Sequence, residues 1–261
     1  MKIGLIQSRG IGDIIVALPI AKYYVDQGNE VYWPINERLM PSFVNAAPYV
    51  HWLPVPLEDD WIYAVPLDML KRASCERIFL MDLCVERPHL TNMAFAFFLK
   101  FDEYKYAVAG VPFREKWNLS IVRDTARERA LFDRVVKAKD FIVAHLQGSN
   151  MTATFRLSSF ASELVKDCQS IEITPLTDNV FDWLLVIERA ALRITLDSCF
   201  ANLIDQLKIP GRKLFIPRSI AHHTPVLQGD WSYLLPPVKR DPPVDQETGK
   251  GLPTIVQPKV Q

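Results

Sequence analysis

Short apolar segments, with the composition of buried β-strands, alternate along this chain with segments that carry apolar residues at helical spacing. Parallel strands need a crossover connection between them, and a helix in that position forms a βαβ unit. The alternation occurs in two sets, which a charged helical segment at residues 124–139 separates. The pattern therefore predicts two mostly parallel sheets, each covered by helices.

The predicted elements define two Rossmann-like halves. The strands are expected at residues 2–7, 30–35, 50–55, 77–83, 141–146, 170–174, 192–196 and, as the last strand, 212–216. The helices are expected at residues 13–25, 60–72, 89–99, 124–139, 158–167, 180–190 and 200–207. Pro19 lies inside the first helical pattern and predicts a kink there or a longer loop before the helix. The Phe-rich helix at residues 89–99 is expected to pack against the sheet.

The length of the chain agrees with this division. A chain of 261 residues accommodates two domains of about 100–150 residues each. We expect an N-terminal domain at residues 1–122 and a C-terminal domain at residues 123–235. Residues 236–261 are rich in proline and are expected to form an extended arm or a disordered tail.

Charge and hydropathy exclude several classes of protein. The formal charge at pH 7 is zero, so no large basic field indicates nucleic acid as a partner. No stretch reaches the roughly 18 apolar residues of a transmembrane helix. The first apolar run ends at Gln7, too soon for a signal peptide. We expect a cytoplasmic protein, for which a peripheral membrane contact stays open. The four cysteines lack the spacing of a zinc site.

The loop after the first strand, residues 8–13, has the sequence Ser-Arg-Gly-Ile-Gly-Asp. Its glycines allow close approach of a ligand to the backbone. It is not a dinucleotide-binding fingerprint, because Ile15 occupies the third glycine position. A carboxylate directly after the glycines would also repel a phosphate. Asp13 suits a general base that takes a proton from a hydroxyl nucleophile. A helix N-cap is the simpler interpretation of Asp13, and the local pattern leaves both open.

Three loops of the second half also follow strands, where ligands of open parallel sheets bind. Residues 145–152 offer hydroxyls and amides that suit a phosphate or a sugar, and residues 174–178 suit a base or a ribose. Residues 195–202 place an acid and a hydroxyl before a helix N-terminus. Each loop also has an ordinary interpretation, as a polar turn or as helix capping by Thr177, Asp178, Asp197 or Ser198. The chain contains no Asp-x-Asp motif for a metal-bridged diphosphate.

Several of these segments resemble glycosyltransferase family 9, the heptosyltransferases and their relatives. Members of that family begin with a short strand, a Ser/Gly loop that ends in Gly-Asp, apolar residues and a Leu-Pro, which Gly12-Asp13 and Leu18-Pro19 match. Residues 155–164 look like the family's Trp-Pro-x-x-x-Phe/Trp-x-x-Leu helix start. Residues 184–190 and 197–203 look like the segment that ends in Asp-Thr-Gly-x-x-His-Leu.

The resemblance implies a GT-B fold, in which two Rossmann-like domains with parallel sheets face each other across a cleft. It implies an inverting transfer, without a metal or other cofactor, from a nucleotide-diphosphate sugar to a hydroxyl of a glycan, lipid-linked or other acceptor. Asp13 would be the general base, and Arg9, Gly10 and Gly12 would bind the acceptor. The donor-binding residues implied are Gln147, Gly148, Ser149, Thr152, Arg156, Thr177, Asp197, Ser198 and Asn202.

Three positions depart from the family pattern. Ala153 stands near the family's basic residue, Cys199 replaces the glycine of Asp-Thr-Gly, and Asn202 replaces the histidine. These changes motivate an alternative hypothesis, a catalytically degenerate GT-B module that binds a nucleotide or a partner.

Overall fold

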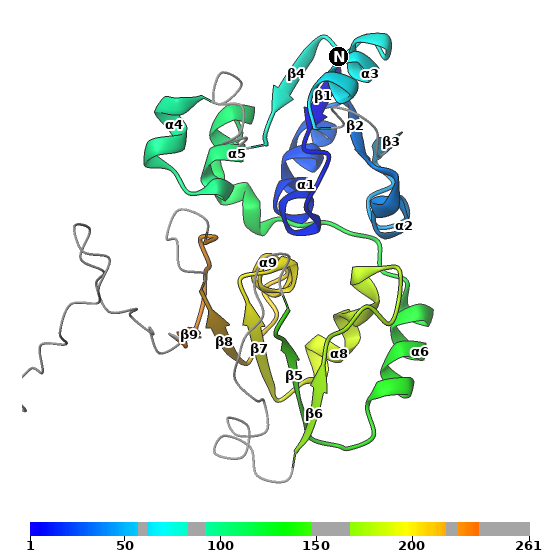
Figure 1. Ribbon diagram of the computed structural model, residues 1–261, viewed down its shortest axis with the longest axis vertical. Coiled ribbons are helices and arrows are strands. Elements are labelled where there is room, and N and C mark those ends of the chain that lie inside the picture. The colour runs from blue at the N-terminus through cyan, green and yellow to red at the C-terminus, as the bar shows by residue number, and fades with distance from the viewer. Residues whose placement is uncertain (57–61, 83–91, 148–167, 218–223, 235–261) are drawn as a thin grey trace, which may run out of the picture.

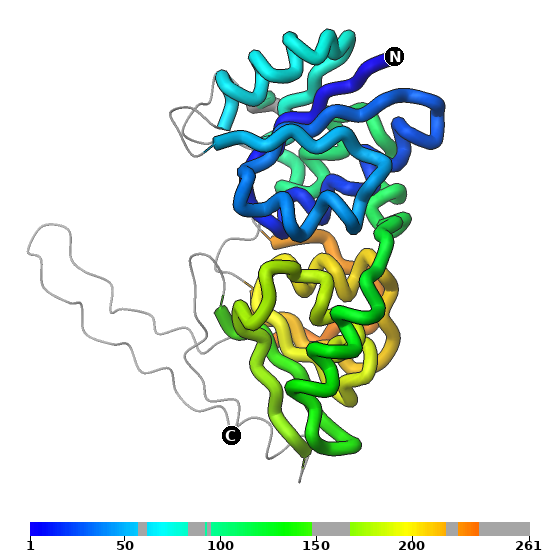
Figure 2. The backbone as a smooth tube through the Cα atoms, turned by 90° about the vertical axis from the view of Figure 1, so that its right-hand side faces the viewer, coloured from blue at the N-terminus to red at the C-terminus, as the bar shows by residue number. Residues whose placement is uncertain are grey.

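The computed structural model of the chain describes residues 1–56, 62–82, 92–147, 168–217 and 224–234 (Figure 1). Within these ranges the chain forms two sheets, and every strand pairing in them is parallel. The prediction of two parallel-sheet halves is therefore confirmed. The two halves lie end to end along the long axis of the molecule (Figure 2). The domain boundary at residue 122 stays a prediction, and residues 236–261 lie outside the described ranges.

The first half contains a four-stranded sheet with the order β3-β2-β1-β4. Its strands are β1 (Lys2–Ile6), β2 (Glu30–Asn36), β3 (Val50–Val55) and β4 (Arg77–Leu80). Its helices are α1 (Ile11–Asp26), α2 (Met40–Phe43), α3 (Ala64–Arg72), α4 (Met93–Phe98) and α5 (Phe101–Ala109), with the 3-10 turns η1 (Glu37–Leu39) and η3 (Phe113–Trp117).

The second half contains a five-stranded sheet with the order β6-β5-β7-β8-β9. Its strands are β5 (Phe141–His145), β6 (Gln169–Glu172), β7 (Leu192–Leu196), β8 (Arg212–Ile216) and β9 (Trp231–Tyr233). Its described helices are α6 (Thr125–Val135), α8 (Leu184–Arg189) and α9 (Cys199–Gln206), with the 3-10 turn η4 (Val180–Trp183). The predicted helix at residues 158–167 lies outside the described ranges.

The expectation that residues 212–216 form the last strand is wrong. The three-residue strand β9 follows and pairs in parallel with β8. Only Trp231 of its residues is buried, while its neighbours on the strand are exposed. A strand this short, with one buried side chain, shows no apolar run in the sequence.

One hydrophobic core runs through both halves. Side chains of β5 alternate between the faces of their sheet, so Phe141 and Val143 join a cluster that also contains Ile3 and Leu5 of β1. The opposite face of the second sheet carries a smaller cluster formed by β5, β7 and Ile216. The larger cluster includes α1 and α9, which pack on each other between the sheets (Figure 1).

Helix α1 continues through Pro19, so the longer loop considered from the sequence is wrong. Proline lacks an N–H, which leaves the carbonyl of Ile15, four residues earlier, without its helical donor. The side-chain amide of Gln206, on α9 in the other half, donates to that carbonyl at 3.3 Å. The carbonyl that lacks its helical donor thereby accepts a hydrogen bond from the other half.

Helix α4 does not pack against the sheet as expected. It contacts α5, and its side chains Phe97 and Phe98 are 67 % and 83 % exposed. The aromatic composition of this segment predicts burial, but the sheet face is already covered by α1 and α5.

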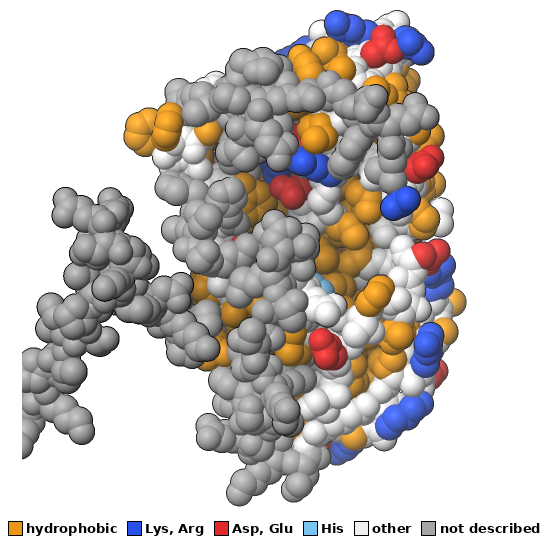
Figure 3. All heavy atoms as spheres, in the orientation of Figure 1, with side chains coloured by type: hydrophobic (Ala, Val, Ile, Leu, Met, Phe, Trp, Pro, Cys, Tyr) orange, Lys and Arg blue, Asp and Glu red, His pale blue; other side chains and the backbone are white. Residues whose placement is uncertain are grey.

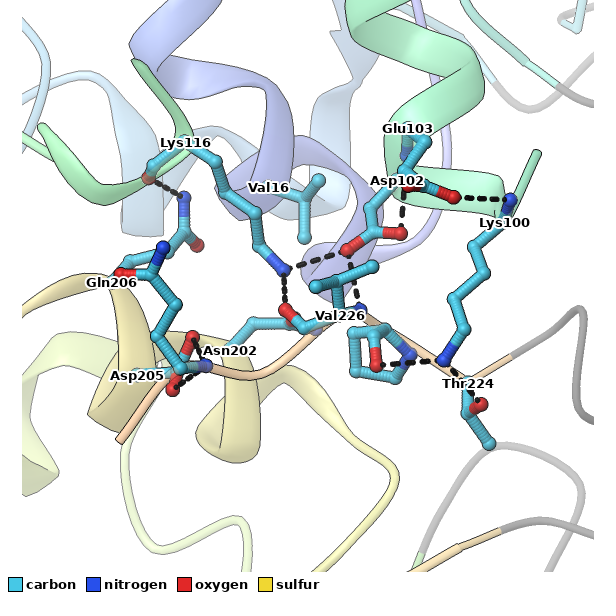
Figure 4. Close-up of polar contacts among 12 residues, drawn as sticks. Val16, Lys100, Asp102, Glu103, Lys116, Asn202, Asp205, Gln206, Thr224 and Val226 are labelled. Carbon is cyan, nitrogen blue, oxygen red and sulfur yellow. Dashed lines mark hydrogen bonds and ion pairs between the residues drawn. The ribbon is translucent and has the colours of Figure 1, made fainter. Parts of the chain in front are cut away.

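A strap at residues 224–228, between β8 and β9, binds the second half to the first (Figure 4). The main-chain N–H of Val226 donates to Asp102 of α5 at 2.8 Å, and its carbonyl accepts from Lys116 of η3. The main-chain N–H of Gln228 donates to Asp205 of α9 at 2.9 Å. Asp205 also accepts from the indole of Trp117 at 2.7 Å. Buried charges therefore join the two halves at this contact.

Candidate functional site

The strand order of each sheet reverses beside its first strand. In the first sheet the chain runs from β1 outward to β2 and β3 and then crosses to β4, on the other side of β1. In the second sheet it runs from β5 to β6 and then crosses to β7, on the other side of β5. Ligands of open parallel sheets bind outside the carboxyl ends of the strands at such a switch point. The candidate site therefore lies at the ends of β1 and β4 and of β5 and β7.

At the first switch point, Asp13 lies in the first turn of α1 and pairs with a lysine of α5. Oδ1 of Asp13 is 3.0 Å from Nζ of Lys105, and 39 % of the Asp13 side chain is exposed. Gly10 has a positive φ of 76°, and a Cβ at this position would lie 2.5 Å from Oδ2 of Asp13. Glycine at position 10 therefore permits both the turn and the position of the carboxylate.

A second ion pair joins the ends of β1 and β4 directly. Nε of Arg9 lies 3.1 Å from Oδ2 of Asp82, whose side chain is largely buried. Gln7 fixes the same loop, because its side-chain amide donates to the carbonyl of Arg9 at 2.9 Å and its main-chain carbonyl accepts from the indole N–H of Trp33 at 3.1 Å. The loop of residues 8–13 is thus held in place by a side chain of β2 and by side chains that follow the ends of β1 and β4.

At the second switch point, the side chain of a histidine contacts that of a serine. Nδ1 of His145, the last residue of β5, lies 2.9 Å from Oγ of Ser198, which precedes α9. The ring of His145 packs edge-on against Phe200, with centroids 4.8 Å apart. Burial lowers the pKa of His145 to about 4, so the imidazole is neutral at pH 7. A neutral imidazole offers one donor and one acceptor.

The two switch points are brought together by the N-termini of α1 and α9. A side chain at position 12 would bring its Cβ to 3.4 Å from the backbone nitrogen and Cα of Cys199. Burial raises the pKa of the Cys199 thiol to about 12, so this sulfur is a packing group and not a thiolate nucleophile. A hollow lined by hydrophobic side chains lies between the two halves, with acidic and basic side chains at its upper rim (Figure 3).

The other residues singled out from the sequence are distributed unevenly. Gln147 is exposed just beyond β5, whereas Asp197 and Asn202 are buried at the start of α9. The hydroxyl of Thr177 donates to the carbonyl of Asn179 at 2.9 Å. Four predicted donor-binding residues, Gly148, Ser149, Thr152 and Arg156, lie outside the described ranges.

The capping interpretations of Asp13, Thr177, Asp178 and Ser198 are wrong. Gly10 occupies the N-cap position of α1, and Asp13 makes an ion pair instead. Ser198 occupies the N-cap position of α9, but its side chain contacts His145 and does not cap the helix. Asn179, and neither Thr177 nor Asp178, caps η4 through a hydrogen bond from the main chain of Phe181 at 2.9 Å. Asp178 pairs with Arg127 of α6.

Sequence reasoning gave no role to four residues of the site: Gln7, Asp82, Lys105 and His145, of which only His145 stood in a candidate loop, at residues 145–152. Gln7, Asp82 and His145 could have been found, because each is the last or the second-last residue of a predicted strand. Lys105 carried little signal, since α5 itself was not predicted and lysine is rarely buried.

We expect the neutral, buried His145 to make the stability of the protein depend on pH. Between pH 6.5 and 4 the unfolded chain takes up a proton that native His145 does not accept. The free energy of unfolding should therefore decrease as the pH is lowered through this window, by up to about 3 kcal/mol from His145 alone. Urea unfolding of wild type and His145→Gln at pH 7 and pH 4.5 measures how much the free energy of unfolding of each protein changes with pH.

His51→Gln is the matched control, because His51 is an exposed histidine of β3. This variant should keep the pH dependence of the wild type, whereas His145→Gln should lose about 2 kcal/mol of it. Equal pH dependence in wild type and His145→Gln would contradict the role of His145 burial.

Comparison with known proteins identifies the fold. No protein-family model matches the sequence, and no curated protein matches it either. The structure is similar to ADP-heptose lipopolysaccharide heptosyltransferase II of Escherichia coli, with a TM-score of 0.65 and 11 % identity over 90 % of each chain. It is also similar to a family 9 glycosyltransferase of Veillonella parvula, with a TM-score of 0.63, 13 % identity and coverage of 90 % of this chain and 86 % of the other.

A third similar structure is the iron-containing, dodecameric heptosyltransferase TibC of enterotoxigenic Escherichia coli, solved in complex with ADP-D-β-D-heptose. The TM-score is 0.55 at 13 % identity, over 86 % of this chain and 60 % of TibC. At these identities the similarity establishes the fold and not the reaction. The predicted GT-B fold is confirmed, and so is the resemblance to family 9 at the level of the fold.

Within the residues that the structure describes, no three side chains of His, Cys, Asp or Glu are grouped so that they could hold a metal ion. None of their helices combines the length and the apolar character that crossing a membrane requires.

Proposed function

We propose that this chain, which has the GT-B fold of the family 9 glycosyltransferases, is itself a glycosyltransferase. It moves a sugar from a nucleotide-diphosphate donor to a hydroxyl of a glycan, a lipid-linked sugar or another acceptor, with inversion and without a metal ion. The first half binds the acceptor and the second half the donor. The cytoplasmic location of the protein is part of the same proposal.

The observation that carries this proposal is the position of Asp13 at the point where the N-termini of α1 and α9 approach each other. The carboxylate lies at the switch point of the first sheet, and a Cβ at Gly12 beside it would lie 3.4 Å from the backbone of Cys199, at the switch point of the second. A base on one side and a helix N-terminus on the other is the arrangement that a displacement at a sugar carbon between them requires.

In the proposed step, an acceptor hydroxyl attacks the anomeric carbon of the donor from the face opposite the diphosphate. The new bond joins the acceptor oxygen to the anomeric carbon, while the bond from that carbon to the phosphate oxygen breaks. Oδ2 of Asp13 takes the hydroxyl proton, and the nucleoside diphosphate leaves with the electron pair. The positive end of the α9 helix dipole stabilises the charge that develops on the leaving group.

His145 and Ser198 contribute to the donor side of the same site. They form a neutral pair 2.9 Å apart, so they add no negative charge that would repel the diphosphate. Asp197 and Asn202, also expected to contact the donor, are buried beside them. The donor-binding roles of Gln147, Gly148, Ser149, Thr152, Arg156 and Thr177, and the acceptor-binding roles of Arg9, Gly10 and Gly12, remain part of the proposal.

A screen of nucleotides tests this proposal. We expect one nucleoside diphosphate, and its sugar conjugate, to raise the Tm of the protein, and we suggest ADP-D-β-D-heptose, UDP-glucose and GDP-mannose as first probes. The conjugate that binds should release its nucleoside diphosphate when incubated with the enzyme, by slow transfer to water. Binding without release would favour the degenerate module, and absence of both across a complete set of nucleotide sugars would refute the proposal.

A further inference from the structure

Lys105 is a buried cation in direct contact with the proposed base. It lies on α5, and only 1 % of its side chain is exposed. Nζ lies 3.0 Å from Oδ1 of Asp13, 2.6 Å from Oε1 of Gln7 and 3.2 Å from the carbonyl oxygen of Met81. An ammonium has three N–H donors and no acceptor. Three oxygens around one nitrogen therefore fit a protonated lysine.

The position of this ammonium is fixed by the first sheet. The side-chain N–H of Gln7 donates to the carbonyl of Arg9. This bond orients the Gln7 side chain so that its Oε1 faces Lys105. The main-chain N–H of Met81 donates to the carbonyl of Ile6 at 3.0 Å, so Met81 continues the pairing of β4 with β1. The ends of two adjacent strands thus hold the lysine nitrogen in place.

A fixed ammonium in turn fixes the carboxylate. Oδ1 of Asp13 is engaged by Lys105, and Oδ2 lies over Gly10, where a side chain would collide with it. A buried ammonium without its carboxylate would cost several kcal/mol, so the pair resists separation. The Asp13 side chain is therefore held in one orientation although 39 % of it is exposed.

We infer that Lys105 is the positioning residue for Asp13. It occupies Oδ1 of Asp13, so that Oδ2 is the oxygen that receives the proton of the acceptor hydroxyl. Lys105 touches neither donor nor acceptor and acts through Asp13 alone. This inference rests on the proposed function and names a further residue of the same site.

The kinetic test uses the full chain and ADP-D-β-D-heptose as the probe, with water as the acceptor. Lys105→Met should lower kcat for release of ADP by about 10- to 100-fold, because a displaced base costs about that much. The KM for the donor should change less than about 3-fold, since the variant leaves ground-state binding intact. Lys213→Met is the matched control, because Lys213 is also a buried lysine, bonded to the carbonyl of Ile209 at 3.3 Å.

A double variant separates positioning from general stability. If Lys105 acts through Asp13, Lys105→Met should cause little further loss of kcat once Asp13→Asn is present. A full additional loss in the double variant, or a loss of the same size in Lys213→Met, would overturn the inference. Where Lys105→Met does not fold, Lys105→Gln takes its place, and failure of both to fold would assign Lys105 to the core alone.

Crystal structures without ligand distinguish this inference from the proposed function. In Lys105→Met the Asp13 carboxylate should leave its place over Gly10, and in Lys213→Met it should stay. An unmoved carboxylate in Lys105→Met would overturn the inference. A displaced carboxylate, in a protein whose wild type releases no nucleoside diphosphate from any nucleotide sugar, would support the positioning by Lys105 and refute the proposed function.

Discussion

Replacement of Asp13 by asparagine is expected to lower kcat for sugar transfer by about 100- to 10,000-fold, the usual contribution of a general base. The amide has almost the same shape as the carboxylate but cannot accept the proton of the acceptor hydroxyl. Donor affinity should change little, because the proposed donor site lies in the other half of the molecule. Initial rates at saturating donor, with the donor Kd from calorimetry, measure the two quantities separately.

Asp26→Asn provides the control for this prediction. Asp26 lies at the last turn of the same helix α1 and pairs with Lys22, in an exposed position far from the glycine loop. It should transfer sugar at the wild-type rate. A near-normal kcat in Asp13→Asn would remove the role given to Asp13, and a weakened donor Kd of matching size would make Asp13 a binding residue instead.

Lys116→Met is expected to cause the largest loss of stability, about 3–5 kcal/mol in the free energy of unfolding. Lys116 of η3 and Asp102 of α5 form an ion pair at 2.6 Å with no side-chain exposure on either partner. Figure 4 shows both groups directed at the strap residue Val226. Methionine fills the volume of lysine but leaves the Asp102 carboxylate buried without its cation.

A double-mutant cycle tests the cause of that loss. Asp102→Asn in the Lys116→Met background removes the isolated charge and should restore about 1–2 kcal/mol, because a neutral amide costs less to bury than a carboxylate. The exposed pair of Arg72 and Asp68, at 2.7 Å, is the control. Its disruption by Arg72→Met should cost no more than about 1 kcal/mol. Urea unfolding of wild type, Lys116→Met, Asp102→Asn and the double variant measures the cycle, and Arg72→Met is unfolded beside them. A loss in Lys116→Met as small as in Arg72→Met would contradict the prediction.

The alternation of strands and helices could be predicted because parallel strands are buried on both faces. Such strands appear as short, nearly continuous apolar runs, as in Lys2–Ile6 and Phe141–His145. Strand ends, and therefore the loops that carry Asp13 and Ser198, follow from the same pattern. Strand β9 was not predicted, because a single buried residue does not form a pattern.

The site could be located from the sequence, but the partners of its residues could not. The rule that ligands bind at the carboxyl ends of strands pointed to the glycine loop and to residues 195–202. Which loops lie at a switch point depends on the strand order, and two strands can follow each other in the sequence without pairing. The order β3-β2-β1-β4 places Asp82 beside Arg9.

For the glycine loop, the sequence by itself determined a strand, a turn that needs glycine and a carboxylate at the start of a helix, because these depend on neighbours in the chain. It also allowed Asp13 to be a helix cap, and the tertiary structure decided against that by placing Lys105 at Oδ1. A lysine is expected to face solvent when only its own helix is considered. Its burial is stable here only because oxygens from β1, α1 and the end of β4 converge on its ammonium, and that convergence exists only once the sheet has formed.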